Sequence, residues 1–146
     1  MIRSSLLALV VVLATACDST PPAPAVSNAW VRAVPPERRM TAAYFVITNS
    51  GDAPLTVVDV RAGGFGRAEM HRTIEEDGIS RMRRVDAIAV PAGDELRLAP
   101  GGLHVMLMAA EAPIEEGAVV DIELEFDDAS TLLLSAPVRR SAPNVD

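Results

Sequence analysis

Both histidines of this chain belong to one series of potential metal ligands, His71, Met82, His104 and Met106. Ten residues separate His71 from Met82, twenty-one separate Met82 from His104, and one separates His104 from Met106. Imidazole nitrogen and thioether sulfur form a soft donor set, and thioethers favour Cu(I) over zinc, magnesium or calcium. The residue types and their spacing therefore predict a site for one Cu(I) ion.

Strand alternation distinguishes these ligands from ordinary core residues. In the segment 103–108 the odd-numbered residues are Leu, Val and Leu, which form one apolar face. His104, Met106 and Met108 then share the opposite, outer face, where burial does not explain them. Residues two apart on a strand lie about 6.5–7 Å apart, so their side chains can converge on one ion. Methionine is more often core filler; we expect this of Met70, and we expect Met108 to border the site.

The other two ligand candidates also point away from the expected core. Met82 stands between two arginines, and His71 shares its strand face with Glu69 and Thr73. Two neutral imidazoles and two thioethers leave a bound Cu(I) with its charge of +1, which a partly exposed site tolerates. Because imidazole binds metal only when neutral, we expect binding to weaken below about pH 6.

The sequence lacks the residues that other kinds of metal or cofactor site require. Zinc prefers thiolate, imidazole and carboxylate, blue-copper centres need a cysteine thiolate, and the C-x-x-C-H haem motif is absent. The one cysteine, Cys17, lies close to the N-terminus. No nucleophile, base and orienting group are available together, so we expect a binding protein and not an enzyme.

Charge and length limit the remaining classes. The chain has 146 residues, which indicates one domain, and its formal net charge is −7, which argues against nucleic acid as a partner. All 13 basic residues are arginine. Arginine is frequent in residues 61–84, whereas residues 111–128 hold eight acids and no base. The arginine-rich region could dock a partner, although a solvated strand face is the commoner explanation.

The N-terminal segment predicts export. Residues 1–16 have a positive start, an apolar run and an A-x-A ending, which is typical of a signal peptide. The run is about half as long as a membrane-spanning helix, which disfavours a retained anchor helix. The segment ending at Cys17 resembles a bacterial lipobox, in which the cysteine is lipidated; the alternative is ordinary secretion with an incidental cysteine. Residues 17–25 are proline-rich and are expected to form an extended tether.

The rest of the chain predicts an all-β, single-domain antiparallel β-sandwich over residues 26–140, followed by a short tail, 141–146. Short β-rich runs recur between Gly, Pro, Asn and Asp breaks, and no long segment has a helical period. We expect strands near 28–34, 42–49, 55–61, 67–74, 79–85, 87–90, 94–98, 103–108, 118–126 and 131–138. The largest core side chains are expected to be Trp30, Tyr44, Phe45, Phe65 and Phe126.

The spacing H-x10-M-x21-H-x-M is the signature of the periplasmic copper chaperones called PCuAC, and the chain resembles this family throughout its folded part. Residues 30–36 resemble the family's opening strand and turn, and residues 41–49 its second strand. Residues 98–107 match its L-x-P-G-G-x-H-x-M-L segment, and residues 117–126 its G-x-x-V-x-x-x-L-x-F strand.

This resemblance implies a cupredoxin-like Greek-key sandwich that binds one Cu(I) through His71, Met82, His104 and Met106. It also implies delivery of copper toward the dinuclear centre of cytochrome c oxidase, with oxidase subunit II or a thioredoxin-like copper assembly factor as partner. The expected location is the periplasmic side of the bacterial envelope, with a lipid anchor at Cys17. Some relatives have a His- and Met-rich tail that binds Cu(II), but the tail of this chain has no such ligands.

Two other functions remain open at this stage. A copper sequestration or tolerance protein would use the same site without a dedicated acceptor. A metal-free lipoprotein scaffolding module would bind no stoichiometric metal.

Overall fold

The computed structural model describes residues 22–143, and in this range the chain forms ten β-strands. They are β1 (Ala25–Arg32), β2 (Met40–Thr48), β3 (Leu55–Ala62), β4 (Phe65–Glu76), β5 (Ile79–Arg84), β6 (Ile88–Val90), β7 (Glu95–Leu98), β8 (Leu103–Ala110), β9 (Val119–Phe126) and β10 (Thr131–Arg139). Each predicted strand has its counterpart here. The described residues include no helix that could cross a membrane. The predicted signal peptide and Cys17 lie outside the described residues.

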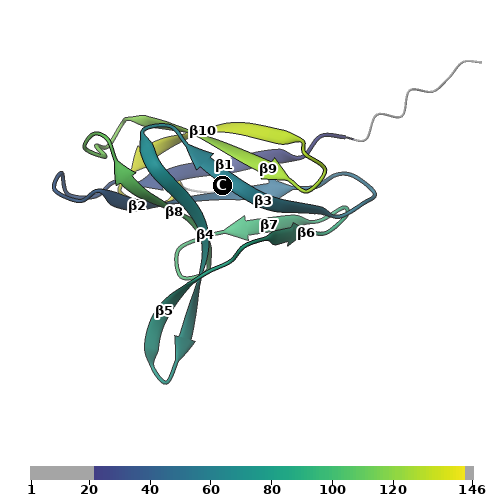
Figure 1. Ribbon diagram of the computed structural model, residues 1–146, viewed down its shortest axis with the longest axis horizontal. Helices are drawn as coiled ribbons and strands as arrows, with labels where there is room; N and C mark the ends of the chain where they lie inside the picture. Colours follow the sequence, from purple (N-terminus) through teal and green to yellow (C-terminus); the bar gives the residue numbers. More distant parts are fainter. Residues whose placement is uncertain (1–21, 144–146) are drawn as a thin grey trace, which may run out of the picture.

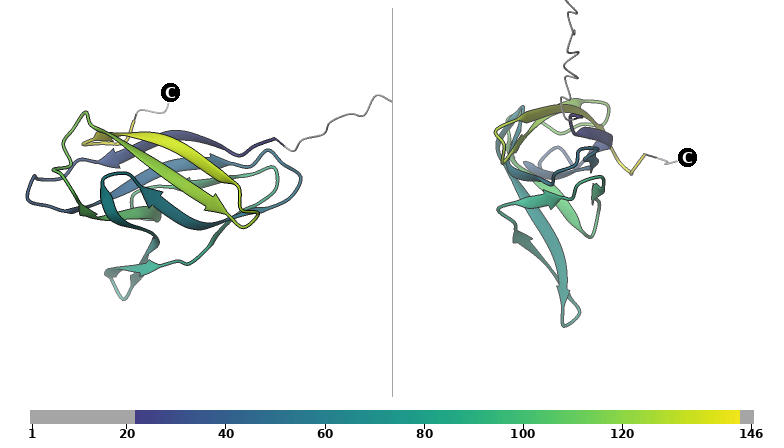
Figure 2. Two further views of the ribbon diagram at one scale, coloured as in Figure 1. Left: turned by 45° about the horizontal axis from the view of Figure 1, so that its top comes forward. Right: turned by 90° about the vertical axis from the view of Figure 1, so that its right-hand side faces the viewer.

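The strands form two packed layers (Figures 1 and 2). Their order is β5-β4-β8-β2-β1-β10-β9-β3-β6, and β7 pairs with the second half of β2. The pairing of β1 with β10 is parallel and joins the two layers, whereas the other pairings are antiparallel. This arrangement confirms the predicted all-β, single-domain sandwich.

The core lies between the layers and is built mainly from branched aliphatic side chains. Phe45 and Phe126 are its largest fully buried members, and Phe65 packs against it from the side. In β8 the predicted alternation is confirmed, since Val105 and Leu107 have no exposed surface and belong to the core. Met70 is also a core residue, as expected.

The predicted burial of Trp30 and Tyr44 is confirmed, but the two side chains are buried on the other face of the sheet from the main cluster. Both side chains are buried, yet neither belongs to the main cluster, which takes their sequence neighbours Val31, Ala43 and Phe45. Because side chains alternate along a strand, the two aromatic rings lie on the opposite face of the sheet. There they pack on each other with ring centroids 4.8 Å apart, on the same face as the outer residues of β8.

The β4–β5 hairpin extends beyond the sandwich (Figure 1; Figure 2, right). The first part of β4 pairs with β8, but residues 73–76 pair only with β5. All six residues of β5 are exposed. Asp77 and Gly78 form the tight turn, both with positive φ (54° and 74°), as a type I′ hairpin turn requires. The hairpin therefore carries Met82 on a largely solvated arm.

Candidate metal centre

The two histidines meet across neighbouring strands. His71 of β4 and His104 of β8 are direct cross-strand partners in the antiparallel register, so both side chains lie on the same face of the sheet. Their ring centroids are 6.0 Å apart. The register thus brings together two residues that are 33 positions apart in the sequence.

The hydrogen bond of His104 leaves one ring nitrogen available. Its Nδ1 lies 3.0 Å from the carbonyl oxygen of Gly102. A carbonyl oxygen only accepts, so Nδ1 carries the proton and Nε2 keeps its lone pair. Nε2 is buried without a hydrogen-bond partner. Buried polar atoms rarely lack partners, and an orphaned imidazole nitrogen is the atom a metal ion would bind.

His71 offers its other nitrogen. Its Nε2 lies 3.0 Å from Oε2 of Glu69, while its buried Nδ1 has no partner. The hydrogen bond from His71 and the guanidinium groups of Arg67 and Arg84 hold the pKa of Glu69 below its usual range, so the carboxylate is ionised. The two histidines therefore leave different buried ring nitrogens without a partner, Nδ1 in His71 and Nε2 in His104.

Burial keeps His104 neutral. Desolvation lowers the pKa of His104, and the nearby His71 and Arg32 lower it further, although the hydrogen bond to Gly102 acts in the opposite direction. Neutral imidazole is the form that binds metal. The surroundings of His104 thus maintain its ligand form at neutral pH.

The thioethers come from the same face. Met82, His104 and Met106 line one open hollow of about 400 Å³. Met106 lies two residues beyond His104 on β8, and the cross-strand partner of Met82 is Thr73, two residues beyond His71. All four predicted ligands therefore lie on one face of three neighbouring strands. Met82 is 59% exposed, which makes it the most accessible of them.

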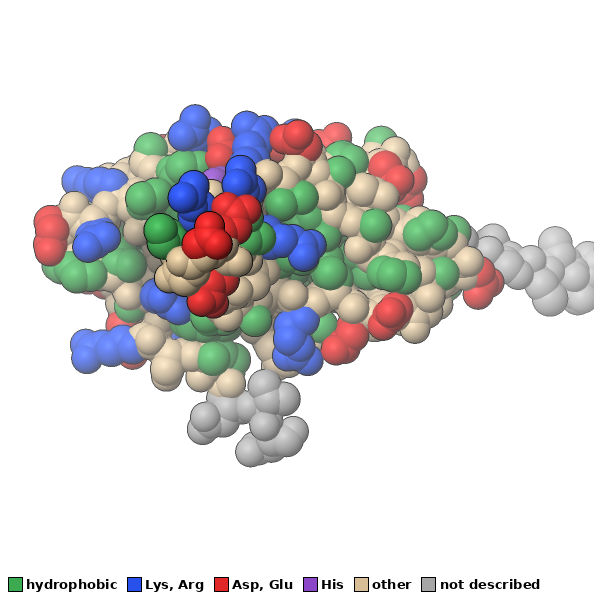
Figure 3. All heavy atoms as spheres, turned by 90° about the horizontal axis from the view of Figure 1, so that it is seen from below, with side chains coloured by type: hydrophobic (Ala, Val, Ile, Leu, Met, Phe, Trp, Pro, Cys, Tyr) green, Lys and Arg blue, Asp and Glu red, His purple; other side chains and the backbone are tan. Residues whose placement is uncertain are grey.

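The predicted partial exposure of the site was wrong for His104, whose exposed fraction is 2%. The ring of Tyr44 lies 6.4 Å from that of His104. The turn before β8 folds over the same space, closed by a hydrogen bond from the Gly102 amide to the carbonyl of Ala99. Viewed from the hairpin side, only a small area of histidine is visible beside arginine side chains (Figure 3). The site is thus a buried pair of rings beside an accessible thioether.

Sequence reasoning missed several neighbours of the site. Met40 is 49% exposed and lines the hollow, and Arg32 stacks over Tyr44 with its Cζ 5.6 Å from the ring centroid. Met40 lies four residues before Tyr44, so strand alternation places it on the same face and could have indicated it. The contact of Arg32 with Tyr44 depends on tertiary structure. Met108, which was expected to border the site, lies further along the face, opposite Met40, and its sulfur is 3.5 Å from Nη2 of Arg67.

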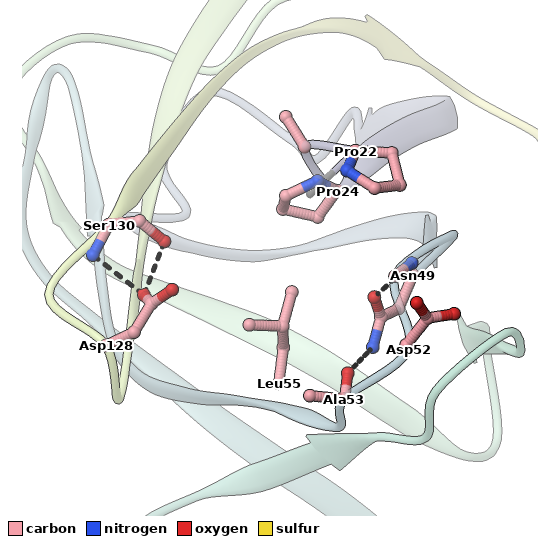
Figure 4. A pocket seen from close by; sticks show the side chains of 10 residues that line it. Pro22, Pro24, Asn49, Asp52, Ala53, Leu55, Asp128 and Ser130 are labelled. Carbon is pink, nitrogen blue, oxygen red and sulfur yellow. Dashed lines mark hydrogen bonds between the residues drawn. The ribbon is translucent and has the colours of Figure 1, made fainter. Parts of the chain in front are cut away.

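A second hollow, of about 570 Å³, is formed by residues of the β2–β3 and β9–β10 connections and the start of the described chain (Figure 4). Its lining contains neither histidine nor methionine. Asn49 donates to the carbonyl of Ala53, and Asp128 accepts from Ser130. These polar groups are satisfied within the protein, so the hollow offers no comparable set of metal ligands.

Solved structures define the class of fold. The solution structure of CuI-DR1885 from Deinococcus radiodurans matches with a TM-score of 0.67 and 33% identity, covering 85% of this chain and 83% of that one. The copper-bound PCuAC domain from PmoF2 matches with a TM-score of 0.67 and 25% identity, covering 85% and 97%. The cupredoxin-like fold and the resemblance to PCuAC domains are thereby confirmed.

Sequence relatives give the family. Residues 24–138 match the family described as "Putative lipoprotein LpqE-like", and the chain belongs to this family. It is 36% identical over 115 residues to "Putative lipoprotein Lxx21020" of Leifsonia xyli subsp. xyli, covering 78% of this chain and 68% of that protein. It is 26% identical over 104 residues to the uncharacterized protein RP573 of Rickettsia prowazekii, covering 70% of this chain and 58% of that protein.

Proposed function

We propose that this protein is an extracytoplasmic copper(I) metallochaperone that binds one Cu(I) through His71, Met82, His104 and Met106. The observation that carries the proposal is the pair of buried imidazole nitrogens, Nδ1 of His71 and Nε2 of His104, which lack partners. The two histidines are cross-strand neighbours, and His104 lines the same hollow as Met82 and Met106. Two of the matching structures, the PCuAC domain from PmoF2 and CuI-DR1885, are copper-bound forms of those relatives.

Accessibility favours transfer of the ion over its permanent storage. Both imidazoles are largely buried, but Met82 lies on an exposed arm. An acceptor thiolate or thioether can approach from that side and displace Met82 before the histidines release the ion. Such ligand exchange never frees the ion into solvent, and it requires no catalytic group. The proposed role is therefore not enzymatic.

The destination of the copper is part of the proposal. The family resemblance supports delivery to the dinuclear copper centre of cytochrome c oxidase, with oxidase subunit II or a thioredoxin-like assembly factor as acceptor. The lipoprotein descriptions of the family and of its relative in Leifsonia xyli support lipidation at Cys17. A lipid there would hold the domain at the membrane on the periplasmic side of the envelope.

The test is an anaerobic Cu(I) titration of the chain that starts after Cys17, against a competing colorimetric chelator. We expect one tightly bound equivalent, which the double substitution Met82→Leu with Met106→Leu abolishes. Met70→Leu is the matched control, because it removes a thioether from the core side of β4 and conserves volume. Failure of the wild-type protein to compete with the chelator would overturn the proposal and favour a scaffolding role.

A gene deletion separates delivery from sequestration, which would use the same site. Loss of oxidase activity at low copper is the outcome expected for delivery. Copper sensitivity with normal oxidase activity would instead identify a sequestration protein.

A further inference from the structure

Both carboxylate oxygens of Glu69 make polar contacts, one with His71 and the other with two arginines. One carboxylate oxygen, Oε2, lies 3.0 Å from Nε2 of His71. The other, Oε1, lies 3.4 Å from Nε of Arg67 and 3.4 Å from Nη1 of Arg84. The side chains of Glu69 and His71 are only 14% and 16% exposed, whereas those of both arginines are more than 60% exposed. The carboxylate is therefore oriented by two cations and directed at the histidine.

This contact decides which nitrogen of His71 is available. Neutral imidazole has two tautomers, and only the one with its proton on Nε2 can donate to a carboxylate. The other tautomer would place a lone pair against the negative oxygen and leave an N–H on the buried Nδ1, which has no hydrogen-bond partner. A ligating histidine usually donates its second N–H to such an outer partner, which fixes the ring and makes the free nitrogen more basic.

We propose that Glu69 is a positioning residue for copper binding, which holds His71 in the tautomer that keeps the lone pair on its buried, unpartnered Nδ1. This inference rests on the proposed function, because it assumes that His71 is a ligand. His104 needs no side chain for the same purpose, since the backbone carbonyl of Gly102 takes its Nδ1 proton. The two rings are thus locked in opposite tautomers by two different acceptors.

The same contact links the hairpin to the histidine. Arg84 lies on β5 and is the direct cross-strand partner of His71. It also bonds the carboxylate that orients the ring of His71. Met82 lies two residues before Arg84 on the same strand. Displacement of β5 would therefore move a thioether and loosen the support of an imidazole together.

The test uses the metal-free protein that starts after Cys17, labelled with ¹⁵N, at pH 8. Because the chain has only two histidines, long-range ¹H–¹⁵N correlation spectra assign both tautomers directly. We expect a proton on Nε2 of His71 and on Nδ1 of His104. Glu69→Ala should convert His71 to a mixture of tautomers and leave His104 unchanged. Glu69→Gln, whose amide oxygen still accepts a hydrogen bond, should largely preserve the wild-type tautomer.

Glu76→Ala is the matched control. It removes the same charge from the same strand and also breaks contacts to two arginines, Arg81 and Arg83, but Glu76 has no bond to a histidine. A Cu(I) titration of each variant should show a 10- to 100-fold loss of affinity for Glu69→Ala, which is typical when an outer partner of a metal ligand is removed. Glu76→Ala should bind as the wild type does, and Glu69→Gln should lie between wild type and Glu69→Ala.

Several results would overturn the assignment of Glu69. They are a wild-type His71 protonated on Nδ1, an unchanged tautomer in Glu69→Ala, or an altered tautomer with undiminished copper affinity. A wild-type protein that binds no Cu(I) would instead overturn the proposed function. The tautomer spectra distinguish these cases, because they are recorded without copper.

Discussion

The environment of His104 couples proton uptake to unfolding. Burial lowers the pKa of this residue in the folded protein, whereas the unfolded chain keeps an ordinary value of about 6.5. Below that pH the unfolded state takes up its proton first, so the free energy of unfolding decreases as the pH falls. The decrease ends below the folded-state pKa, where both states are protonated.

This behaviour is measurable in the metal-free protein. Chemical denaturation between pH 7.5 and 5 should show stability that is constant above about pH 6.5 and declines below it. In His104→Phe, which keeps a ring in the buried space, most of this decline should disappear. An equal decline in the variant would show that groups other than His104 account for the proton uptake.

The same position separates ligand chemistry from packing. His104→Phe and His104→Ala should both weaken Cu(I) binding by orders of magnitude, because both remove Nε2. The alanine variant should also lose about 2–4 kcal/mol of stability, because it leaves a void beside Tyr44. Thermal unfolding and Cu(I) competition on the same samples test this. Near-wild-type affinity in His104→Phe would contradict the assigned site.

At the scale of elements, the β4–β5 hairpin carries the proposed ligand Met82 on an exposed strand, where a substitution should have little effect on stability. Met82 is 59% exposed, so Met82→Leu should change the free energy of unfolding by no more than about 0.5 kcal/mol. The substitution keeps the apolar character but removes the sulfur, so Cu(I) affinity should fall at least tenfold. Urea denaturation and chelator competition measure the two effects. A stability loss as large as the binding loss would place Met82 in the packing instead.

The hairpin turn provides a second test. Gly78 has a φ of +74°, where a β-branched residue is strained. Gly78→Val should therefore destabilise the turn by about 1–2 kcal/mol. The end of the arm pairs only with itself, so the strain should loosen β5 and lower Cu(I) affinity. Gly93→Val is the matched control, because Gly93 has a φ of +67° and a similarly open setting in the β6–β7 turn. Equal binding losses in both variants would argue against a role for the arm.

At the scale of the whole molecule, the features that could be predicted from the sequence are those that depend on local patterns of residues. All ten strands and the outward face of β8 follow from alternation and turn residues, which act over a few positions. The burial of His104 and the packing of Trp30 on Tyr44 could not be predicted in this way. They depend on register between distant strands, on the bulge between Ser27 and Trp30, and on the fold of the turn before β8.

The hydrogen-bond partners of the histidine ring nitrogens also could not be predicted from local sequence patterns. Gly102 and Glu69 each lie two residues before a histidine in the sequence. That spacing places Glu69 on the same face of β4 as His71, but it does not say which ring nitrogen it contacts. The choice of tautomer emerges only when β8 and the hairpin are assembled around β4. Residue types and spacing were therefore enough to predict the ligand set. The ring nitrogen that carries the proton in each histidine is determined by tertiary structure.

The position of β5 at the end of the strand order has a consequence for self-association. Its outer backbone groups have no neighbouring strand within residues 22–143, and an exposed strand edge readily recruits another chain. Arg81, Arg83 and Arg84 surround Met82 on this strand, so a second copy pairing there would bring like charges together. The arginines thus disfavour pairing of β5 with a second copy of the chain and leave the edge that carries the proposed ligand Met82 accessible to a different partner.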